Sequence, residues 1–160
     1  MTVVLVLNAG SSSIKWRLVD GQSGAAIRGG TVERLGHDAS EGTGHSAAIR
    51  DLLAELRHEP VAVIGHRVVH GGSKFDTATL VTDEVEQQIE ELAALAPLHN
   101  SVNLAGIRAA RAAFPGTPNF AVFDTAFHRT LLPAAASYAL PAGLVRRHQI
   151  RRYGFHGISY

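Results

Sequence analysis

The chain has 160 residues, with 15 Lys and Arg against 14 Asp and Glu, nine His and no Cys. This length suits one domain with a sizeable core, and a composition of 46% hydrophobic and 18% charged residues excludes a disordered chain. The absence of cysteine excludes disulfides and thiolate zinc sites. No apolar run approaches the ~20 residues of a membrane-spanning helix, and a net charge of +1 leaves no basic footprint for nucleic acid. These features predict a cytoplasmic globular domain that binds neither membrane nor nucleic acid.

Apolar patterns near the start of the chain predict strands. We expect them over residues 2–7, 14–19 and 26–34, the first being a nearly continuous run of β-branched residues and leucine. Turn residues cluster between these runs, so the chain is expected to open as a β-meander. A surface loop is expected over the Gly-containing stretch 36–44.

Helices then alternate with strands, as apolar stripes with helical spacing and short apolar runs indicate. Thr82 caps the second of these helices, and Pro97 is expected to end it. The order of these elements, strands first and then alternating helices and strands, predicts an α/β layer fold. The remaining expected elements are a helix over 48–56, a strand over 61–69, helices over 83–96 and 101–114, a strand over 120–123 and a short helix after residue 141.

The Gly-Ser loop after the first strand is a candidate anion site. Its backbone N–H groups and hydroxyls can converge on one anion, and Lys15 is expected on the strand face opposite Ile14 and Trp16. The loop is not a Walker A motif, because Lys15 enters a strand rather than a helix. A serine-rich hairpin turn with a solvated lysine is an equally weighted alternative.

Charged residues end the strand over 61–69. Arg67 is expected to pair bidentately with a carboxylate or phosphate, either of a ligand or of an acid in this chain. Alternation places Val69 on the same face as Arg67. His66 and His70 are better explained as structural residues than as zinc ligands, because no spacing specifies a third ligand.

A single carboxylate, Asp124, follows the buried strand over 120–123. Ligands bind at this edge of open α/β sheets, so Asp124 is a candidate ligand of a divalent cation. Capping of the next turn is the alternative. His99 and His156 lie in expected loops within reach of a ligand, and neither specifies a role by itself.

Together these segments resemble the acetate kinase family, whose members are acyl-phosphate-forming kinases of the actin-like ATPase superfamily. The resemblance implies a ribonuclease-H-like/actin-like ATPase lobe, a mixed sheet with antiparallel opening strands flanked by helices. It also implies transfer of the γ-phosphoryl of ATP to acetate with Mg²⁺, giving acetyl phosphate and ADP. The segments are VLNAGSSSIK at 6–15, GHRVVHGG at 65–72, APLHN at 96–100, FDTAFH at 123–128 and RYGFHG at 152–157.

The resemblance assigns the opening loop to the nucleotide. Asn8 is expected near Mg²⁺, and Lys15 near the nucleotide phosphates. The loop hydroxyls of Ser11 and Ser13 are expected to bind the same phosphates, as backbone and side-chain donors in such a loop would.

The remaining site residues are assigned to the acceptor and to catalysis. Arg67 is expected to bind the acceptor carboxylate and the transferring phosphoryl, with Val69 and His99 in the substrate pocket. His156 is expected to stabilise the transition state. Asp124 matches the family's catalytic carboxylate, and we favour a role in orienting acetate and Mg²⁺, because acetate is already ionised at neutral pH.

The match covers well under half of a typical family member. We therefore expect residues 1–160 to be the N-terminal lobe of a two-lobed enzyme, inactive without the C-terminal nucleotide-binding lobe. Ser101 stands where the family usually has Pro, and Tyr160 where it usually has His. Family members are homodimers through contacts mainly in the other half, which leaves the oligomeric state of this chain open.

Three other functions are weighed against this one. Propionate kinase shares every quoted motif. A noncatalytic phosphate-binding module would keep the fold without transfer. A metal-dependent hydrolase is the third, and it would use His66, His70, Asp124 and His128.

Overall fold

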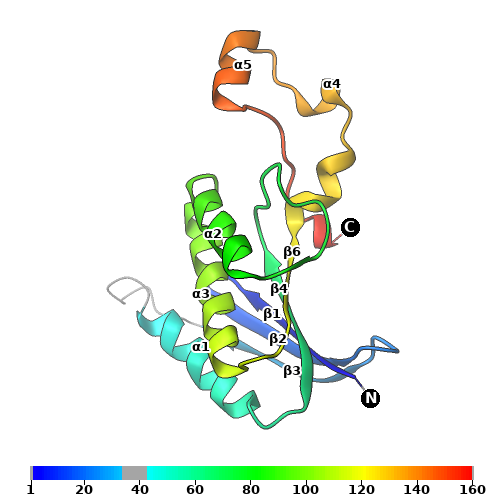
Figure 1. Cartoon of the computed structure of the whole chain (residues 1–160), viewed down its shortest axis with the longest axis vertical. Coiled ribbons are helices and arrows are strands. Elements are labelled where there is room, and N and C mark those ends of the chain that lie inside the picture. The colour runs from blue at the N-terminus through cyan, green and yellow to red at the C-terminus, as the bar shows by residue number, and fades with distance from the viewer. Residues whose placement is uncertain (1, 34–42, 160) are drawn as a thin grey trace.

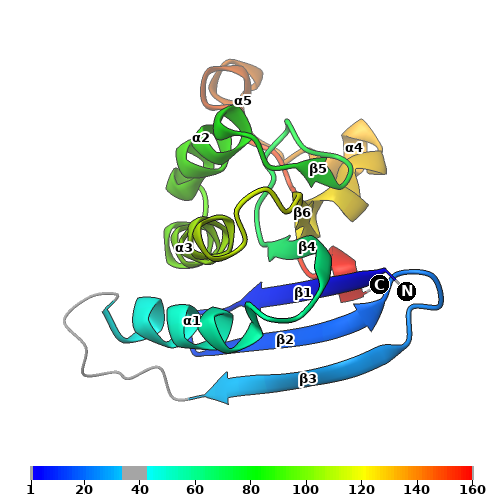
Figure 2. The ribbon, with the colours of Figure 1, turned by 60° about the horizontal axis from the view of Figure 1, so that its bottom comes forward.

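The computed structural model describes residues 2–33 and 43–159 and contains a six-stranded mixed sheet of order β3-β2-β1-β4-β6-β5. The first three strands are antiparallel, β4 and β6 run parallel to β1, and β5 is antiparallel to β6 (Figure 2). The expected mixed sheet with antiparallel opening strands is therefore confirmed. The strands are β1 Val3–Ala9, β2 Ser13–Asp20, β3 Ala26–Glu33, β4 Val61–Val68, β5 Thr79–Leu80 and β6 Asn119–Phe123.

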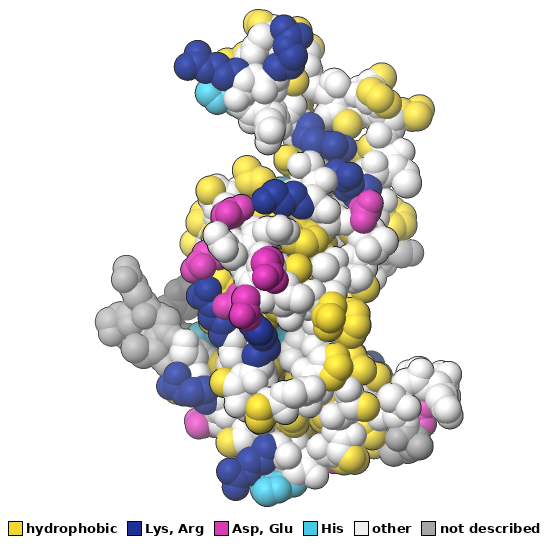
Figure 3. Space-filling view, in the orientation of Figure 1, with side chains coloured by type: hydrophobic (Ala, Val, Ile, Leu, Met, Phe, Trp, Pro, Cys, Tyr) yellow, Lys and Arg dark blue, Asp and Glu magenta, His cyan; other side chains and the backbone are white. Residues whose placement is uncertain are grey.

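Helices α1 and α3 lie side by side and cover one face of the sheet, and α2 packs beside α3 (Figures 1 and 2). Ion pairs from Arg108 and Arg111 of α3 to Glu86 join α3 to the acidic α2, over which Figure 3 shows the acidic side chains gathered. The helices are α1 Thr43–Leu56, α2 Asp83–Glu91, α3 Pro97–Ala113, α4 Pro133–Ala136 and α5 Ala142–His148, with 3₁₀ turns at Leu92–Ala94, Asp124–Thr130 and Gly157–Ser159.

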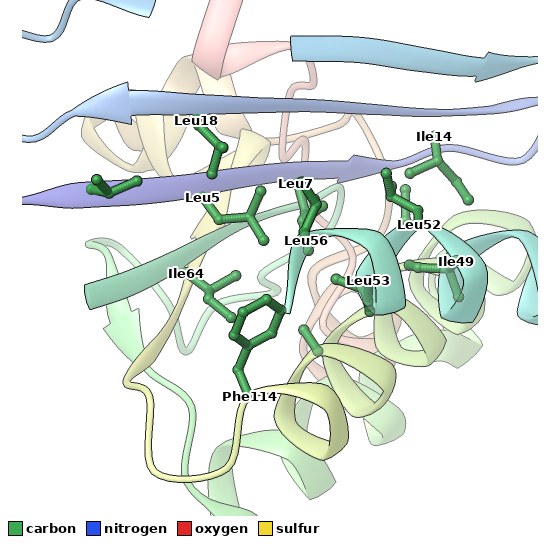
Figure 4. Close-up of a cluster of buried hydrophobic side chains, with 13 residues drawn as sticks. Leu5, Leu7, Ile14, Leu18, Ile49, Leu52, Leu53, Leu56, Ile64 and Phe114 are labelled. Atoms are coloured by element: carbon green, nitrogen blue, oxygen red, sulfur yellow. The ribbon is translucent and has the colours of Figure 1, made fainter. Parts of the chain in front are cut away.

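The core lies between the sheet and these helices. Alternate residues of β1 and β2, including Leu5, Leu7 and Ile14, pack against Leu53 and Leu56 of α1 (Figure 4). Burying each such side chain contributes about 1.5–3 kcal/mol. Because only one face of each element is buried, its apolar residues recur with the period of the strand or helix, and this period was detectable in the sequence. A second cluster lies under α2 and α3 and includes Val68, Phe75, Ile107 and Phe123, with the rings of Phe75 and Phe123 stacked 4.4 Å apart.

The opposite face of the sheet is more open. Val6 of β1 and Val122 of β6 point to this side and are 41% and 36% exposed. Lys15 and Arg67 belong to the same face, because Lys15 pairs with Asn8 and Arg67 pairs with Val122 in the strand register. The candidate anion-binding side chains thus lie on the face away from α1 and α3.

Several element boundaries differ from the sequence-based expectation. β1 continues to Ala9, so Asn8 lies in a strand rather than in a turn. Pro97 does not end a helix: α2 ends at Glu91, and Pro97 is the first residue of α3, where its missing N–H removes no helical hydrogen bond. β5 and α4, with 2 and 4 residues, were not predicted, because such short segments carry no periodicity.

Three expectations fall partly or wholly outside the described residues, the first being the last residue of the strand expected over 26–34. The loop expected over 36–44 is described only at its last two residues, which belong to α1. Tyr160, where the family usually has His, lies outside the described residues.

The chain after β6 projects away from the sheet as an arm and then returns to the sheet. α4 and α5 lie in this projecting arm (Figure 1). Arg152 closes the arm, since its backbone N–H donates to the carbonyl of Ala136 and its Nη1 to that of Ala135. Over the described parts of the chain, no helix has the length and apolar character needed to span a membrane.

Candidate active site

A cavity of about 510 Å³ opens where β4 and β6 end and α3 begins. It brings together every residue that the sequence assigned to the acceptor and to catalysis. Other lining residues come from the turn before α3 and from the segment after the arm. The cavity is lined by Arg67, Val69, Leu95, Ala96, Pro97, Leu98, His99, Asp124, Phe155 and His156.

The centre of this cavity is an ion pair between Arg67 and Asp124. Nη2 of Arg67 donates to Oδ2 of Asp124 at 2.5 Å, and Nε donates to both carboxylate oxygens at 3.1 and 3.2 Å. The strand register produces this contact, because Arg67 pairs with Val122 and Asp124 lies two residues further on the same face. Asp124 is 1% exposed, and a carboxylate buried to this extent requires a partner.

The geometry bears on two alternatives left open by the sequence. The bidentate partner expected for Arg67 is an acid of this chain. The capping role considered for Asp124 is wrong, since the 3₁₀ turn Asp124–Thr130 has Phe123 at its N-cap and no side-chain cap. The carboxylate of Asp124 is directed to the guanidinium instead.

Asn8 extends the pair across the sheet. Nη1 of Arg67 donates to Oδ1 of Asn8 at 3.1 Å, so β1, β4 and the turn after β6 contribute one polar side chain each to a connected row. Lys15 is exposed beside Asn8, and both line a second hollow of about 620 Å³. Ser11 is exposed and Ser13 half-buried in the adjoining loop, and neither lines the cavity around Arg67.

The backbone of the segment 154–157 presents His156 to the cavity. His156 has a left-handed φ of 57°, and Gly154 a φ of 77°. Gly157 lies so close to the turn after β6 that a Cβ there would clash with the carbonyl oxygen of Asp124. A hydrogen bond of 2.9 Å between Nε2 of His128 and the carbonyl of Phe155 also joins this segment to that turn. A non-glycine residue held at positive φ is typical of functional sites.

The cavity has a charged end and an apolar wall. Arg67 and Asp124 form the charged end, His156 also lines the cavity, and Val69 and Phe155 belong to the apolar wall. Such a cavity suits a small anion with an alkyl group, because the guanidinium binds the charge while the wall excludes water from the carbon chain.

His66 and His70 have structural roles, as the sequence indicated. A hydrogen bond of 2.7 Å joins Nε2 of His66 to Oδ1 of Asn119, and burial lowers the pKa of His66 to about 4. Nδ1 of His70 accepts from the backbone N–H of Gly72 at 2.9 Å, and burial lowers the pKa of this ring too. Over residues 2–33 and 43–159, no group of three or more His, Cys, Asp or Glu is placed to hold a metal, so the four residues weighed for a metal-dependent hydrolase do not form such a group.

Oxygen donors for Mg²⁺ are nevertheless present. Asn8 offers an amide oxygen and Asp124 a carboxylate, and hard cations take oxygen ligands. Both groups also bind Arg67. This donor set fits an Mg²⁺ ion held mainly by phosphate oxygens and water, with one or two protein ligands.

Sequence reasoning missed two buried asparagines of α3. Asn100 and Asn103 are 0% and 3% exposed and hydrogen-bond to the backbone at Ala9, Val69 and His70. The detectable signal was their spacing: they occupy the same helical stripe as Leu104 and Ile107, which face the core. A buried polar group in an apolar stripe implies a specific partner.

An α/β lobe with a partly buried Arg–Asp pair beside an apolar wall offers a cavity suited to a small anion. Comparison with known proteins makes this specific. The Acetokinase family model matches residues 3–160, and the chain belongs to that family. The fold is accordingly the α/β lobe of the actin-like ATPase type found in acetate kinases.

Individual relatives agree with this assignment. The whole chain matches acetate kinase of Leifsonia xyli at 49% identity, covering 46% of that protein. Among solved structures, acetate kinase of Porphyromonas gingivalis superposes with a TM-score of 0.87 at 37% identity, covering 99% of this chain and 46% of the other. A propionate kinase from Francisella tularensis gives 0.82 at 37% identity, with the same coverage. The chain spans about half the length of the curated relatives it matches, which is more than the well under half expected from the sequence.

Proposed function

We propose that residues 1–160 form the N-terminal lobe of an acetate kinase, which transfers the γ-phosphoryl of ATP to acetate. The observation that carries the proposal is the cavity at Arg67, where a preorganised guanidinium lies beside an apolar wall. Family membership supplies the reaction class. A C-terminal lobe would bring the nucleotide to this cavity, and the complete protein is proposed to be a cytoplasmic homodimer, as the family resemblance implies.

Arg67 would bind both the acceptor and the phosphoryl in transfer. Its bonds to Asp124 and Asn8 use three of the five N–H groups of the guanidinium, so two others are able to bind an anion in the cavity. Charge spreads over the equatorial oxygens of the transferring phosphoryl, and His156 together with Arg67 would stabilise that charge. Val69 and Phe155 would hold the methyl group, with His99 at the rim.

Asp124 would orient the reacting groups rather than remove a proton. Its carboxylate fixes the guanidinium plane of Arg67. The guanidinium would therefore keep its orientation when the substrate binds. The co-substrate ATP would place its phosphates near Asn8 and Lys15, with Ser11 and Ser13 as further donors. When bound through Asn8 and Asp124, Mg²⁺ would neutralise phosphate charge.

Propionate is the alternative acceptor. The likeness to a propionate kinase at a TM-score of 0.82 favours it as a second substrate of the same cavity. Both acceptors present a carboxylate to Arg67 and differ by one methylene against the wall that contains Val69.

The test is acyl phosphate formation, trapped as hydroxamate, from ATP, Mg²⁺ and acetate or propionate. The chain is assayed alone and fused to the C-terminal lobe of an acetate kinase. We expect activity only in the fusion, reduced at least about 100-fold by Arg67→Ala or Asp124→Asn, and unchanged by Arg57→Ala at an exposed position in the turn after α1. A folded but inactive fusion would reject the proposal in favour of a noncatalytic phosphate-binding module.

A further inference from the structure

Strands β1 and β4 separate just before the site. Their parallel pairing runs from Val3 to Leu7, the last partners being Leu7 and His66. Beyond that point the two strands lead to different parts of the site: β1 to the Ser loop, residues 10–13, and β4 to Arg67 and Val69. Separated strand ends leave backbone groups without ladder partners, and in a buried position such groups must find other ones.

One side chain of α3 hydrogen-bonds to backbone groups at the ends of both strands. Nδ2 of Asn103 donates to the carbonyl of Ala9 at 2.7 Å, and Oδ1 of Asn103 accepts from the backbone N–H of Val69 at 3.0 Å. The carboxamide therefore replaces the strand ladder at the point where the ladder ends. Asn103 is 3% exposed, so water does not compete for these bonds.

The bridge requires an amide held at a fixed depth. A planar amide carries a donor and an acceptor on one rigid group, which a hydroxyl or a carboxylate does not offer in the same geometry. Gly106, one turn along α3, sets the depth, because a Cβ at that position would be 3.1 Å from Cβ of Ala9. The helix thus lies against the end of β1 and presents Asn103 to both strands.

The neighbouring Asn100 makes a different pair of contacts. Its Oδ1 accepts from the N–H of His70, and its Nδ2 donates to the carbonyl of the same residue. Asn100 therefore holds the segment after β4 to α3 but does not reach β1. With equal burial and the same helix, it is a matched control for a bridging function.

We propose that Asn103 is a positioning residue that fixes the distance between the Ser loop and the Arg67–Val69 segment. The inference rests on the proposed function, in which the loop binds ATP phosphates and the segment binds the carboxylate acceptor. Asn103 touches neither substrate. It sets the separation of the two half-sites, namely the loop that binds ATP and the segment that binds the acceptor. A phosphoryl group has to cross this separation in line.

The expected kinetic signature follows from this geometry. Each half-site keeps its own ligand contacts when the bridge is lost, so the KM values for acetate and ATP change little. Alignment of donor and acceptor is lost, and a misplacement of about 1 Å can lower the rate roughly 100-fold. A residue that merely stabilised the fold would not separate kcat from KM in this way.

The first measurement is amide hydrogen exchange on the 160-residue chain. Asn103→Ala is expected to raise exchange about tenfold or less at residues 10–13 and at Val69, as loss of one or two hydrogen bonds of ordinary strength would. Asn100→Ala is expected to raise exchange at residues 70–72 and to leave 10–13 unchanged. Faster exchange throughout the sheet, or an unchanged loop in Asn103→Ala, would overturn the inference.

The second measurement uses the fusion with a C-terminal lobe. Asn103→Ala is expected to lower kcat about 10- to 100-fold with KM values within about threefold. Asn103→Asp donates to Ala9 only when protonated, so its kcat relative to the unsubstituted fusion is expected to rise as the pH falls. Equal losses in Asn100→Ala and Asn103→Ala would refute a bridging role. An inactive unsubstituted fusion would reject the proposed function alone, because the exchange pattern still tests the bridge.

Discussion

Arg67 and Asp124 bind each other through two guanidinium nitrogens and both carboxylate oxygens, although 57 residues separate them in the chain. The side chain of Arg67 is 26% exposed while that of Asp124 is 1% exposed, so the pair has one buried and one accessible end. Its accessible end faces the cavity. A charge held in place before substrate arrives is what electrostatic catalysis requires, because no reorganisation is then needed during the reaction.

Removal of Arg67 alone is predicted to destabilise the chain. Arg67→Ala leaves the carboxylate of Asp124 buried without its partner, and we expect the free energy of unfolding to fall by roughly 2–3 kcal/mol. This is at or below the 3–5 kcal/mol typical of fully buried pairs, because the guanidinium is partly exposed. Urea unfolding of the 160-residue chain measures the change.

The double variant Arg67→Ala with Asp124→Ala is the control for this prediction. Removing both charges eliminates the unpaired carboxylate, so the loss is expected to be smaller than the sum of the two single losses. Strict additivity would show that the two side chains do not interact in solution.

Val69 is predicted to control acceptor length. It lines the cavity beside Arg67, and Val69→Ala gives space where an acyl methyl is expected. Discrimination of one methylene by an apolar wall is worth about 1–3 kcal/mol, so the ratio of kcat/KM for propionate over acetate is expected to rise about tenfold in the fusion. Steady-state hydroxamate assays with both acids measure the ratio.

Val68→Ala is the matched control for that experiment. Val68 is adjacent in the chain but fully buried on the opposite face of β4, in the cluster with Ile107 and Phe123. Its truncation is expected to lower stability by about 1–3 kcal/mol and to leave the substrate ratio unchanged. A similar ratio change in both variants would mean that the cavity responds to general loosening of β4.

Most of the fold was predictable because its signals are local. Leu5, Ile14 and Leu53 alternate or recur with the period of their element, and burial of one face is the physical cause of that period. The boundary at Pro97 was misassigned because proline both ends helices and begins them, and the sequence does not state which.

The site was predictable only as separate pieces. Arg67 and Asp124 were each recognised as charges at strand ends, but their mutual contact depends on the register of β4 with β6, which no local pattern encodes. The bridge at Asn103 was missed for a related reason. Its partners, Ala9 and Val69, lie 94 and 34 residues away, and only tertiary packing brings them together.

Stability is predicted to depend on pH through His66. Burial lowers its pKa from 6.5 to about 4, so between these values the unfolded chain binds a proton that the folded chain does not. The contribution of the neutral ring is complete above pH 6.5 and is lost progressively as the pH falls towards 4. Over this window the free energy of unfolding is expected to fall by about 3 kcal/mol.

His66→Gln tests this assignment, since an amide retains a hydrogen-bonding group for Asn119 but does not titrate. The variant is expected to be less stable at pH 7, but its unfolding free energy should fall less steeply between pH 6.5 and 4. His70, whose pKa burial also lowers, leaves part of the slope in place. Parallel curves for the variant and the unsubstituted chain would contradict the role of His66.

Gly157 is predicted to be required for the position of His156. A Cβ at Gly157 would clash with the carbonyl oxygen of Asp124 and lie 2.5 Å from Cβ of Phe127, and neither atom belongs to a flexible side-chain end. Gly157→Ala therefore has to push the segment 154–157 away from the turn after β6. We expect a loss of about 1–3 kcal/mol in urea unfolding, as overpacking of a closed contact gives, and a lower kcat in the fusion because His156 moves with the segment.

Gly143→Ala separates this effect from the general consequence of replacing a glycine. Gly143 belongs to α5, and a Cβ there has no atom within 4 Å. Alanine at that position is expected to raise the free energy of unfolding by up to about 0.5–1 kcal/mol, since it restricts the unfolded chain and favours the helix. A lower free energy of unfolding in Gly157→Ala and a higher one in Gly143→Ala would show that the contact with Asp124 is what requires glycine at 157. An unchanged free energy of unfolding in Gly157→Ala would show that this contact does not hold the segment carrying His156.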